Sequence, residues 1–192
     1  QFDGSGSGTQ FGKIPSKTDA AKKLSTGQWY HVATTYDQAT RIARIYLNGK
    51  LLDEAKDVGV AGSSSENRIR LAPRVTENGK AGEGYCFLVG NSYNPNRSLQ
   101  GKIAEFRVWR TARSGQEIWN NMYRIDAPES QEDLIGYWKC NDGKGDTVTD
   151  YSRYKNHGKF GAKEQWQITT GISVDKKERE WTTNVEIPEI NK

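Results

Sequence analysis

Short apolar stretches alternate with polar and glycine-rich runs along most of the chain. Trp29 to Tyr36 is dense in aromatic and β-branched residues, which predicts a strand. Ile42 to Leu47 and Lys50 to Leu52 flank Asn48-Gly49. Because Asn and Gly tolerate positive φ at both central positions, this dipeptide predicts a two-residue type I′ hairpin. The segment from Trp29 to Leu52 therefore predicts an antiparallel β-structure.

The same criteria place further strands along the chain, and one helix. The strands are predicted at Arg68 to Ala72, Tyr85 to Gly90, Lys102 to Trp109, Leu134 to Cys140 and, with weaker signals, near Gln165 to Thr169 and Gly171 to Val174. Ser114-x-x-Glu117 is a capping box, and apolar residues follow it at helical spacing, so a helix is predicted from Ser114 to about Arg124. Gln1 to Lys23 is expected to be a loop or weak edge strand, and Asn141 to Gly158 a polar loop. The pattern predicts an all-β protein with one short helix.

Composition and charge narrow the class of partner. The chain of 192 residues is 34% hydrophobic, enough for a real core, and its 20 glycines against one methionine favour many turns. The 28 basic and 24 acidic residues are scattered, so the net charge of +4 indicates a mixed surface and no nucleic-acid-binding stripe. The apolar stretches are far shorter than the roughly 20 residues that a membrane span needs.

Two cysteines, Cys86 and Cys140, lie in apolar strand-like stretches. Two interpretations stay open. They are either two buried free thiols or, in an oxidising compartment, one disulfide. A bridge that closes so long a loop would stabilise the fold by about 4 kcal/mol in the chain-entropy model.

Several motifs resemble a known family, the laminin-G-like jelly rolls of the concanavalin A-like lectin and glucanase superfamily. The motifs are Gly27-Gln28-Trp29-Tyr30-His31-Val32-Ala33, Tyr36-Asp37, Ile45-Tyr46-Leu47-Asn48-Gly49-Lys50, Leu88-Val89-Gly90-Asn91, Leu99 to Trp109, and Ala112-Arg113-Ser114-x-x-Glu117-Ile118. Leu134 to Trp138, followed by Asp150-x-Ser152 and Asn156-His157-Gly158, is similar to a second pattern that is appended to such domains in bacterial surface proteins.

This resemblance implies an antiparallel jelly-roll β-sandwich with one short helix, over residues 1–125. Because few residues precede Trp29, we expect this sandwich to lack its first strands. Residues 126–192 are expected to form a β-rich C-terminal segment that packs on the sandwich or completes it. The resemblance further implies an extracellular or cell-surface location, as in an outer-membrane lipoprotein of a glycan-foraging bacterium, next to other domains of the same protein. The chain itself contains no signal peptide.

Glycan binding requires exposed aromatic faces for sugar C–H surfaces, with amide or carboxylate groups nearby. Two loops offer both kinds of group. The candidate ligand-binding residues are Asn91, Tyr93, Asn94 and Asn96 in one loop and Tyr151, Tyr154 and Asn156 in the other. The alternative for either cluster is ordinary loop packing on the rim of the sandwich.

The second loop is also rich in the hard oxygen ligands that Ca²⁺ prefers. The candidate calcium ligands are Asn141, Asp142, Asp146 and Asp150, with Ser152 and Asn156 as further oxygen donors. The spacing is not that of an EF-hand, and the same residues are also common in turns.

Catalytic groups have no clear pattern. Glucanases of this fold carry Glu-x-Asp-x-x-Glu on one strand, which this sequence lacks. The acidic group Glu129, Glu132 and Asp133 lies in a polar connection, and neither His31 nor His157 is spaced for a nucleophile or a zinc site. We therefore expect a non-enzymatic carbohydrate-binding module. The alternatives are a structural or protein-interaction module and, third, a glycoside hydrolase.

Overall fold

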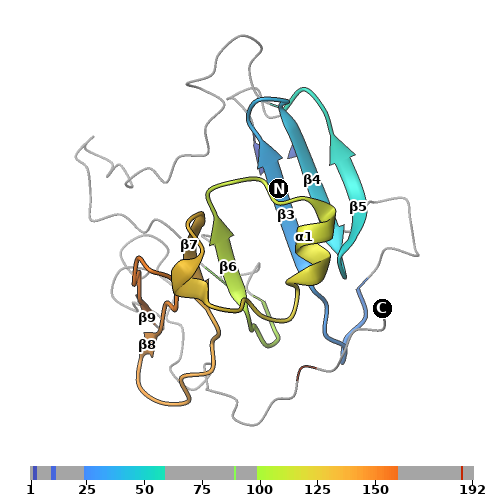
Figure 1. Cartoon of the computed structure of the whole chain (residues 1–192). Coiled ribbons are helices and arrows are strands. Elements are labelled where there is room, and N and C mark those ends of the chain that lie inside the picture. The colour runs from blue at the N-terminus through green and yellow to red at the C-terminus, as the bar shows by residue number, and fades with distance from the viewer. Residues whose placement is uncertain are drawn as a thin grey trace, which may run out of the picture. The chain divides into compact units, whose positions relative to one another are not determined.

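The structure is a computed structural model that describes residues 2–3, 10–11, 24–58, 89, 99–159 and 187 (Figure 1). The chain forms two compact units. The first comprises residues 1–68, 109–127 and 185–192, and the second comprises residues 69–108 and 128–184. Four predicted strands lie outside the described residues, apart from Val89: Arg68 to Ala72, Tyr85 to Gly90, Gln165 to Thr169 and Gly171 to Val174. None of the described helices is both long and apolar enough to span a bilayer.

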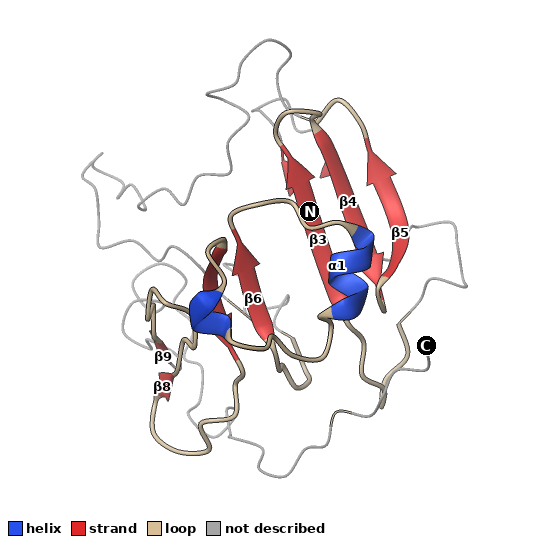
Figure 2. Cartoon of the chain, in the orientation of Figure 1, coloured by secondary structure: helices blue, strands red, loops and turns tan. Residues whose placement is uncertain are grey.

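The first unit is built on an antiparallel sheet of β3 (Val32–Asp37), β4 (Ile42–Leu47) and β5 (Lys50–Ala55), in that order. Figure 2 shows these strands as adjacent arrows. The central strand β4 is the most deeply buried, with Ala43, Ile45 and Tyr46 each at most 5% exposed. A bulge at Leu52 shifts the register between β4 and β5, after which pairing continues to Ala55. The strand that was predicted to end at Leu52 is therefore longer.

The turn between β4 and β5 has the predicted type I′ character. Asn48 and Gly49 have φ values of 49° and 72°, and Leu47 pairs directly with Lys50. The turn is tied back to the chain before β3, because Asn48 N donates to His31 O at 2.7 Å and His31 N donates to Asn48 Oδ1 at 3.0 Å. Gly49 is buried, and a Cβ there would lie 2.5 Å from Cε3 of Trp119. The tip of the hairpin is thus packed against a side chain of α1.

The helix α1 (Gly115–Asn120) begins at the predicted capping box. Ser114 Oγ accepts from Glu117 N, and the Glu117 carboxylate accepts from Ser114 N at 2.8 Å. The helix ends earlier than predicted because the Asn121 side chain, as well as its backbone N–H, donates to the Glu117 carbonyl at the C-cap. Beyond that cap, Met122 and Ile125 remain buried. The weak edge strand expected near the N-terminus corresponds to β1 (Phe2–Asp3), paired with β2 (Gln10–Phe11).

The described elements of the second unit are the strands β6 (Phe106–Trp109), β7 (Leu134–Trp138), β8 (Thr147–Val148) and β9 (Gly158–Lys159) and the 3-10 helix η3 (Pro128–Ser130). The last residue of β6, Trp109, is assigned to the first unit. β6 pairs with β7, and β8 pairs antiparallel with β9. Two strands are shorter than predicted because Glu105 and Cys140, with φ near 58°, interrupt the extended backbone. The segment 141–158 is not wholly loop, since it begins the β8–β9 pair. The all-β class with one short α-helix is confirmed.

Four tryptophans that lie in or beside the strands and the helix are partly exposed. Trp29, Trp109, Trp119 and Trp138 are each half-buried. Among the described residues of the second unit, the largest fully buried side chains are those of Leu134, Tyr137, Asp150 and Ser152. Two of these four are polar, so the second unit depends on hydrogen bonding inside its core.

Candidate functional site

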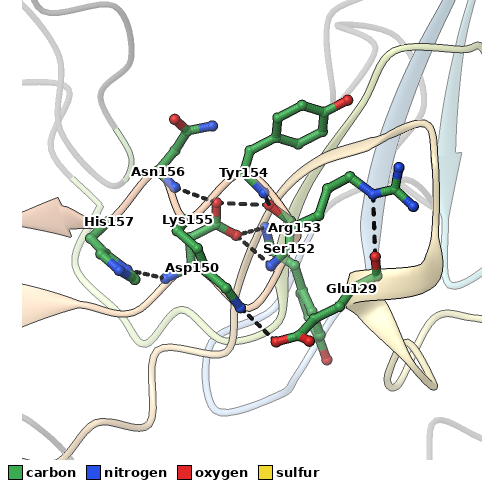
Figure 3. A network of polar contacts seen from close by, with 9 residues as sticks. Glu129, Asp150, Ser152, Arg153, Tyr154, Lys155, Asn156 and His157 are labelled. Carbon is green, nitrogen blue, oxygen red and sulfur yellow. Dashed lines mark hydrogen bonds and ion pairs between the residues drawn. The ribbon is translucent and has the colours of Figure 1, made fainter.

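A cluster of hydrogen-bonded polar groups in the second unit surrounds the carboxylate of Asp150, which is 0% exposed (Figure 3). Its Oδ1 accepts from the backbone N–H groups of Tyr137 and Ser152, both at 2.8 Å. Its Oδ2 accepts from Ser152 Oγ at 2.8 Å and from Asn156 N at 2.7 Å. Four donors thus satisfy one buried charge, and they join β7 to the loop of residues 150–157, here called the Asp150 loop.

These hydrogen bonds also set the protonation of Asp150. Burial on its own would raise the pKa of this carboxyl, but the donors of Tyr137, Ser152 and Asn156 outweigh burial and hold the pKa below its ordinary value of 3.8. The folded loop therefore favours the ionised form of Asp150.

Further contacts fix the Asp150 loop at both of its ends. Tyr151 N donates to Tyr137 O at 2.8 Å, and Asp150 N donates to Nδ1 of His157 at 3.1 Å. Asn156 is held twice: its carbonyl accepts from Trp138 Nε1 at 3.0 Å, and its Nδ2 donates to Ile135 O at 3.1 Å. The loop is a rigid platform because its backbone is tied at several points to β7.

Two predicted ligand-binding tyrosines of this loop have different surroundings. The ring of Tyr151 lies 6.3 Å from the ring of Tyr137, and the ammonium of Lys139 lies 4.4 Å above the Tyr151 ring. One face of Tyr151 is thus already covered. Tyr154 is 41% exposed, and in Figure 3 its ring points away from Asp150. Its hydroxyl donates a long hydrogen bond of 3.5 Å to Glu132 O.

Arg153 and Lys155, the two basic residues on either side of Tyr154, differ in their partners. Lys155 Nζ forms an ion pair of 2.6 Å with the Glu129 carboxylate, which lowers the pKa of Glu129 through a hydrogen bond and a charge. Arg153 uses its Nε to donate to the backbone carbonyl of Glu129 at 3.2 Å. The polar connection that contains Glu129 and Glu132 therefore contacts three side chains of the Asp150 loop, those of Arg153, Tyr154 and Lys155.

A second polar cluster lies where β6 meets β7. The Tyr137 hydroxyl donates to Glu105 Oε2, and Arg107 Nη2 donates to the same oxygen at 2.9 Å. The Arg107 guanidinium lies 5.4 Å from the centre of the Tyr137 ring. All three residues lie in segments that carry the family resemblance, Leu99 to Trp109 and Leu134 to Trp138, but the sequence patterns did not predict that they form one polar cluster. The positive φ of Glu105 had no sequence signal either, because it is not a glycine.

The candidate calcium ligands are spread along the same segment. Asn141 and Asp146 are exposed, while the Asp142 carboxylate accepts from Thr149 N at about 3.2 Å through both oxygens. The Asp150 carboxylate is occupied by its four donors. Within the described ranges, no three His, Cys, Asp or Glu side chains are grouped to hold a metal ion. The calcium site stays a prediction.

The remaining candidates are one thiol pair and one loop. Cys140 is half-buried and forms no disulfide with another described residue. As a thiol, it has a pKa that burial, together with the negative charges of Asp142 and Glu105, raises to about 11. Its predicted partner Cys86 lies outside the described residues, so the disulfide stays a prediction. The other candidate sugar-binding loop lies outside them as well: Asn91, Tyr93, Asn94 and Asn96.

Comparison with known proteins places most of the chain in one family. Residues 2–119 match the model of the concanavalin A-like lectin/glucanases superfamily. Pappalysin-1 from Mus musculus is 30% identical over 116 residues, which make up 55% of this chain and 6% of pappalysin-1. The chain thus spans a small part of that relative.

Two solved structures are also similar. A candidate carbohydrate binding protein from Bacteroides ovatus is 30% identical, with a TM-score of 0.50, over 72% of this chain and 36% of that one. An S-layer domain-containing protein from Clostridium thermocellum is 26% identical over 51% of this chain and 41% of that one, with a TM-score of 0.32. The chain again covers less than half of each neighbour.

Proposed function

Because the chain belongs to the concanavalin A-like lectin/glucanases superfamily, we propose that it is a non-catalytic module that binds carbohydrate outside the cell, as part of a bacterial surface protein. The observation that carries this proposal is the exposed ring of Tyr154 on a loop that is clamped around a buried carboxylate. The similarity to the Bacteroides ovatus protein supports the same function.

The surroundings of Tyr154 suit a sugar. A pyranose ring binds through its C–H face to an aromatic face and through its hydroxyls to fixed polar groups. Asn156 is exposed, and since its Nδ2 is engaged with Ile135 O, its Oδ1 is oriented as an acceptor. Because the loop is already held in place, little conformational entropy is lost when a ligand binds.

The carboxylates near Tyr154 support a binding role over hydrolysis. A retaining glycosidase needs two carboxyl groups about 5 to 5.5 Å apart that are free to react. Asp150 is buried and accepts four hydrogen bonds, and Glu129 is paired with Lys155. Hydrolysis of any polysaccharide by the purified chain would contradict the non-catalytic assignment.

The test is a glycan array, followed by titration calorimetry with the best ligand. Tyr154→Ala should weaken that binding roughly tenfold or more, as loss of a central aromatic contact does. Tyr154→Phe is the matched control, because it keeps the ring and removes only the hydroxyl, and it should bind like the unmodified chain. A folded chain that binds no glycan, or a Tyr154→Ala variant of unchanged affinity, would refute the proposed site.

A structural or protein-interaction role is the second candidate, and one observation favours it. Three large apolar side chains of the first unit are strongly exposed: Leu24 at 45%, Val32 at 50% and Leu51 at 54%. Exposed apolar groups of this size are typical of protein contacts when they are contiguous. If glycan binding is unchanged when all three side chains are mutated, any protein contact that they make is separate from the glycan site.

Calcium binding remains a separate proposal, with Asn141, Asp142 and Asp146 as the ligands still able to contribute oxygens. If a calcium ion binds there, added Ca²⁺ should raise the melting temperature, because any ligand that binds only the folded state stabilises it. A melting curve that is the same in calcium and in chelator would remove the proposal.

A further inference from the structure

Arg153 and Tyr154 reach the same short connection from the Asp150 loop. Arg153 Nε donates to the carbonyl of Glu129, and the Tyr154 hydroxyl donates to the carbonyl of Glu132. Two residues three positions apart in a chain are separated by at most about 10 Å. Figure 3 shows the Arg153 side chain, like the Tyr154 ring, pointing away from Asp150. The guanidinium of Arg153 and the ring of Tyr154 thus both lie beside this one connection.

Within the described ranges, Arg153 contacts a backbone carbonyl and is not paired with a carboxylate. Glu129, which approaches it through its carbonyl, has its own carboxylate bound to Lys155 at 2.6 Å. Among the residues that the structure describes, no acidic side chain forms an ion pair with Arg153. Because Nε is already engaged, the guanidinium is oriented, and its two Nη groups can donate in parallel to one anion.

From this arrangement we infer that Arg153, beside Tyr154, selects glycans that carry an anionic group, such as the carboxylate of a uronic acid or a sulfate. The ring of Tyr154 contacts the sugar face, and the Nη groups of Arg153 bind the anion as a two-pronged donor. This inference rests on the proposed function and adds the class of ligand. The site lies beyond residues 2–119, the part of the chain that the family model covers.

The experiment uses the full chain and three probes: oligosaccharides of galacturonic acid, the same oligosaccharides as neutral methyl esters, and a sulfated galactan. The free acid should bind roughly tenfold or more tightly than its methyl ester, which is the size of effect expected for a charge-assisted bidentate contact. The advantage should shrink at high salt because the site is exposed. Stronger binding of the sulfated galactan alone would identify sulfate as the source of the anion.

Variants separate Arg153 from the overall charge of the protein. Arg153→Gln should abolish the preference for the free acid, and Arg153→Lys should retain only part of it. Arg124→Gln is the matched control, since it removes one exposed arginine of the first unit with the same change in net charge, and it should leave the preference intact. Glu129→Gln should increase the preference, because it releases the charge of Lys155.

The outcomes distinguish the two levels of the proposal. Equal affinity for the acid, the ester and the sulfated galactan, or a preference for an anionic probe that Arg153→Gln leaves unchanged, overturns the inference about anions. In that case, a loss of binding in Tyr154→Ala would still support carbohydrate binding at this loop. If the folded chain binds none of the three probes and no glycan on the array, both proposals are wrong.

Discussion

The Asn48-Gly49 hairpin of the first unit and the Asp150 loop of the second are both tight connections, but different forces hold them. The hairpin depends on two residues that accept positive φ and on contact between Gly49 and Trp119. The Asp150 loop depends on one buried charge and its four donors. A local backbone preference therefore organises the first connection, whereas in the second a side chain organises the backbone around it.

This difference determines how each connection should fail. Steric change damages the hairpin, because its tip is packed and its backbone conformation is unusual. Loss of charge damages the Asp150 loop, because donors buried around a carboxylate are costly to leave unsatisfied. The proposed binding residues Arg153 and Tyr154 belong to the second connection, so their function depends on that charge.

The largest effect is expected from Asp150→Ala. It leaves three buried donors and one partly buried donor without an acceptor and should lower the free energy of unfolding by about 4 kcal/mol. Asp146→Ala removes an exposed aspartate from the same segment and should change stability by no more than about 0.5 kcal/mol. Chemical denaturation measures both. Equal losses in the two variants would mean that the network around Asp150 does not hold the loop.

Gly49→Ala is expected to be next in size. Its Cβ would meet Trp119 at 2.5 Å in a residue with φ of 72°, so strain and overpacking should together cost about 2 to 3 kcal/mol. Gly27→Ala is the matched control, because Gly27 has φ of 78° and nothing within 4 Å of the added Cβ. That control should cost only about 1 kcal/mol. If the two glycines respond alike, the packing against Trp119 contributes nothing.

Acid should weaken the second connection more than the first. Because the pKa of Asp150 is lowered in the folded state, its contribution is complete above its ordinary pKa of 3.8 and is lost as the pH falls through the folded-state value. The melting temperature should therefore drop between about pH 5 and pH 2. Asp150→Asn cannot ionise, so its deficit relative to the unmodified chain should shrink over that range.

A residual acid dependence should persist in Asp150→Asn, since two exposed carboxyls of the first unit also have lowered pKa values. Backbone donation from Thr40 lowers the pKa of Asp37, and donation from Ser114 lowers that of Glu117. An Asp150→Asn deficit that stays constant from pH 5 to pH 2 would contradict the role assigned to the Asp150 charge.

The smallest of these effects concerns the helix. Ser114→Ala removes the N-cap of α1 and should cost about 1 kcal/mol in the free energy of unfolding. Gln116→Ala changes an exposed side chain of the same helix that bonds to Asn120 and takes no part in the capping box, and it should change stability by less than about 0.5 kcal/mol. A thermal melt of the two variants side by side tests this, and a silent Ser114→Ala would show that the cap is dispensable.

Sequence patterns predicted the first unit well. Alternating apolar residues, Asn48-Gly49 and the Ser114-x-x-Glu117 box are local signals, and each corresponds to an observed strand, turn or helix start. The family resemblance drawn from the same segments was confirmed by the match over residues 2–119. Element ends were less predictable, because neither the bulge at Leu52 nor the positive φ of Glu105 has a local sequence signal.

The candidate site was only half visible in the sequence. Composition singled out Tyr154 and Asn156 as candidates, and their binding role stays a prediction. The structural role of Asp150 was missed, because a carboxylate that binds backbone N–H groups has no periodicity; Asp150 was instead assigned to calcium. Asp-x-Ser followed by Asn-His-Gly carried the available signal, since short polar residues at these spacings commonly hydrogen-bond to their own backbone. The contact between the Lys139 ammonium and the Tyr151 ring could not be predicted from the sequence, because it depends on the tertiary fold.

The raised pKa of Cys140 has a practical consequence for labelling chemistry. With a pKa of about 11, this thiol is ionised in roughly one molecule in ten thousand at pH 7, and only the thiolate reacts. Maleimides and mild oxidants should therefore modify Cys140 far more slowly than an ordinary surface cysteine. A fluorophore attached to a cysteine introduced beside Tyr154 could then report on glycan binding with little background from Cys140.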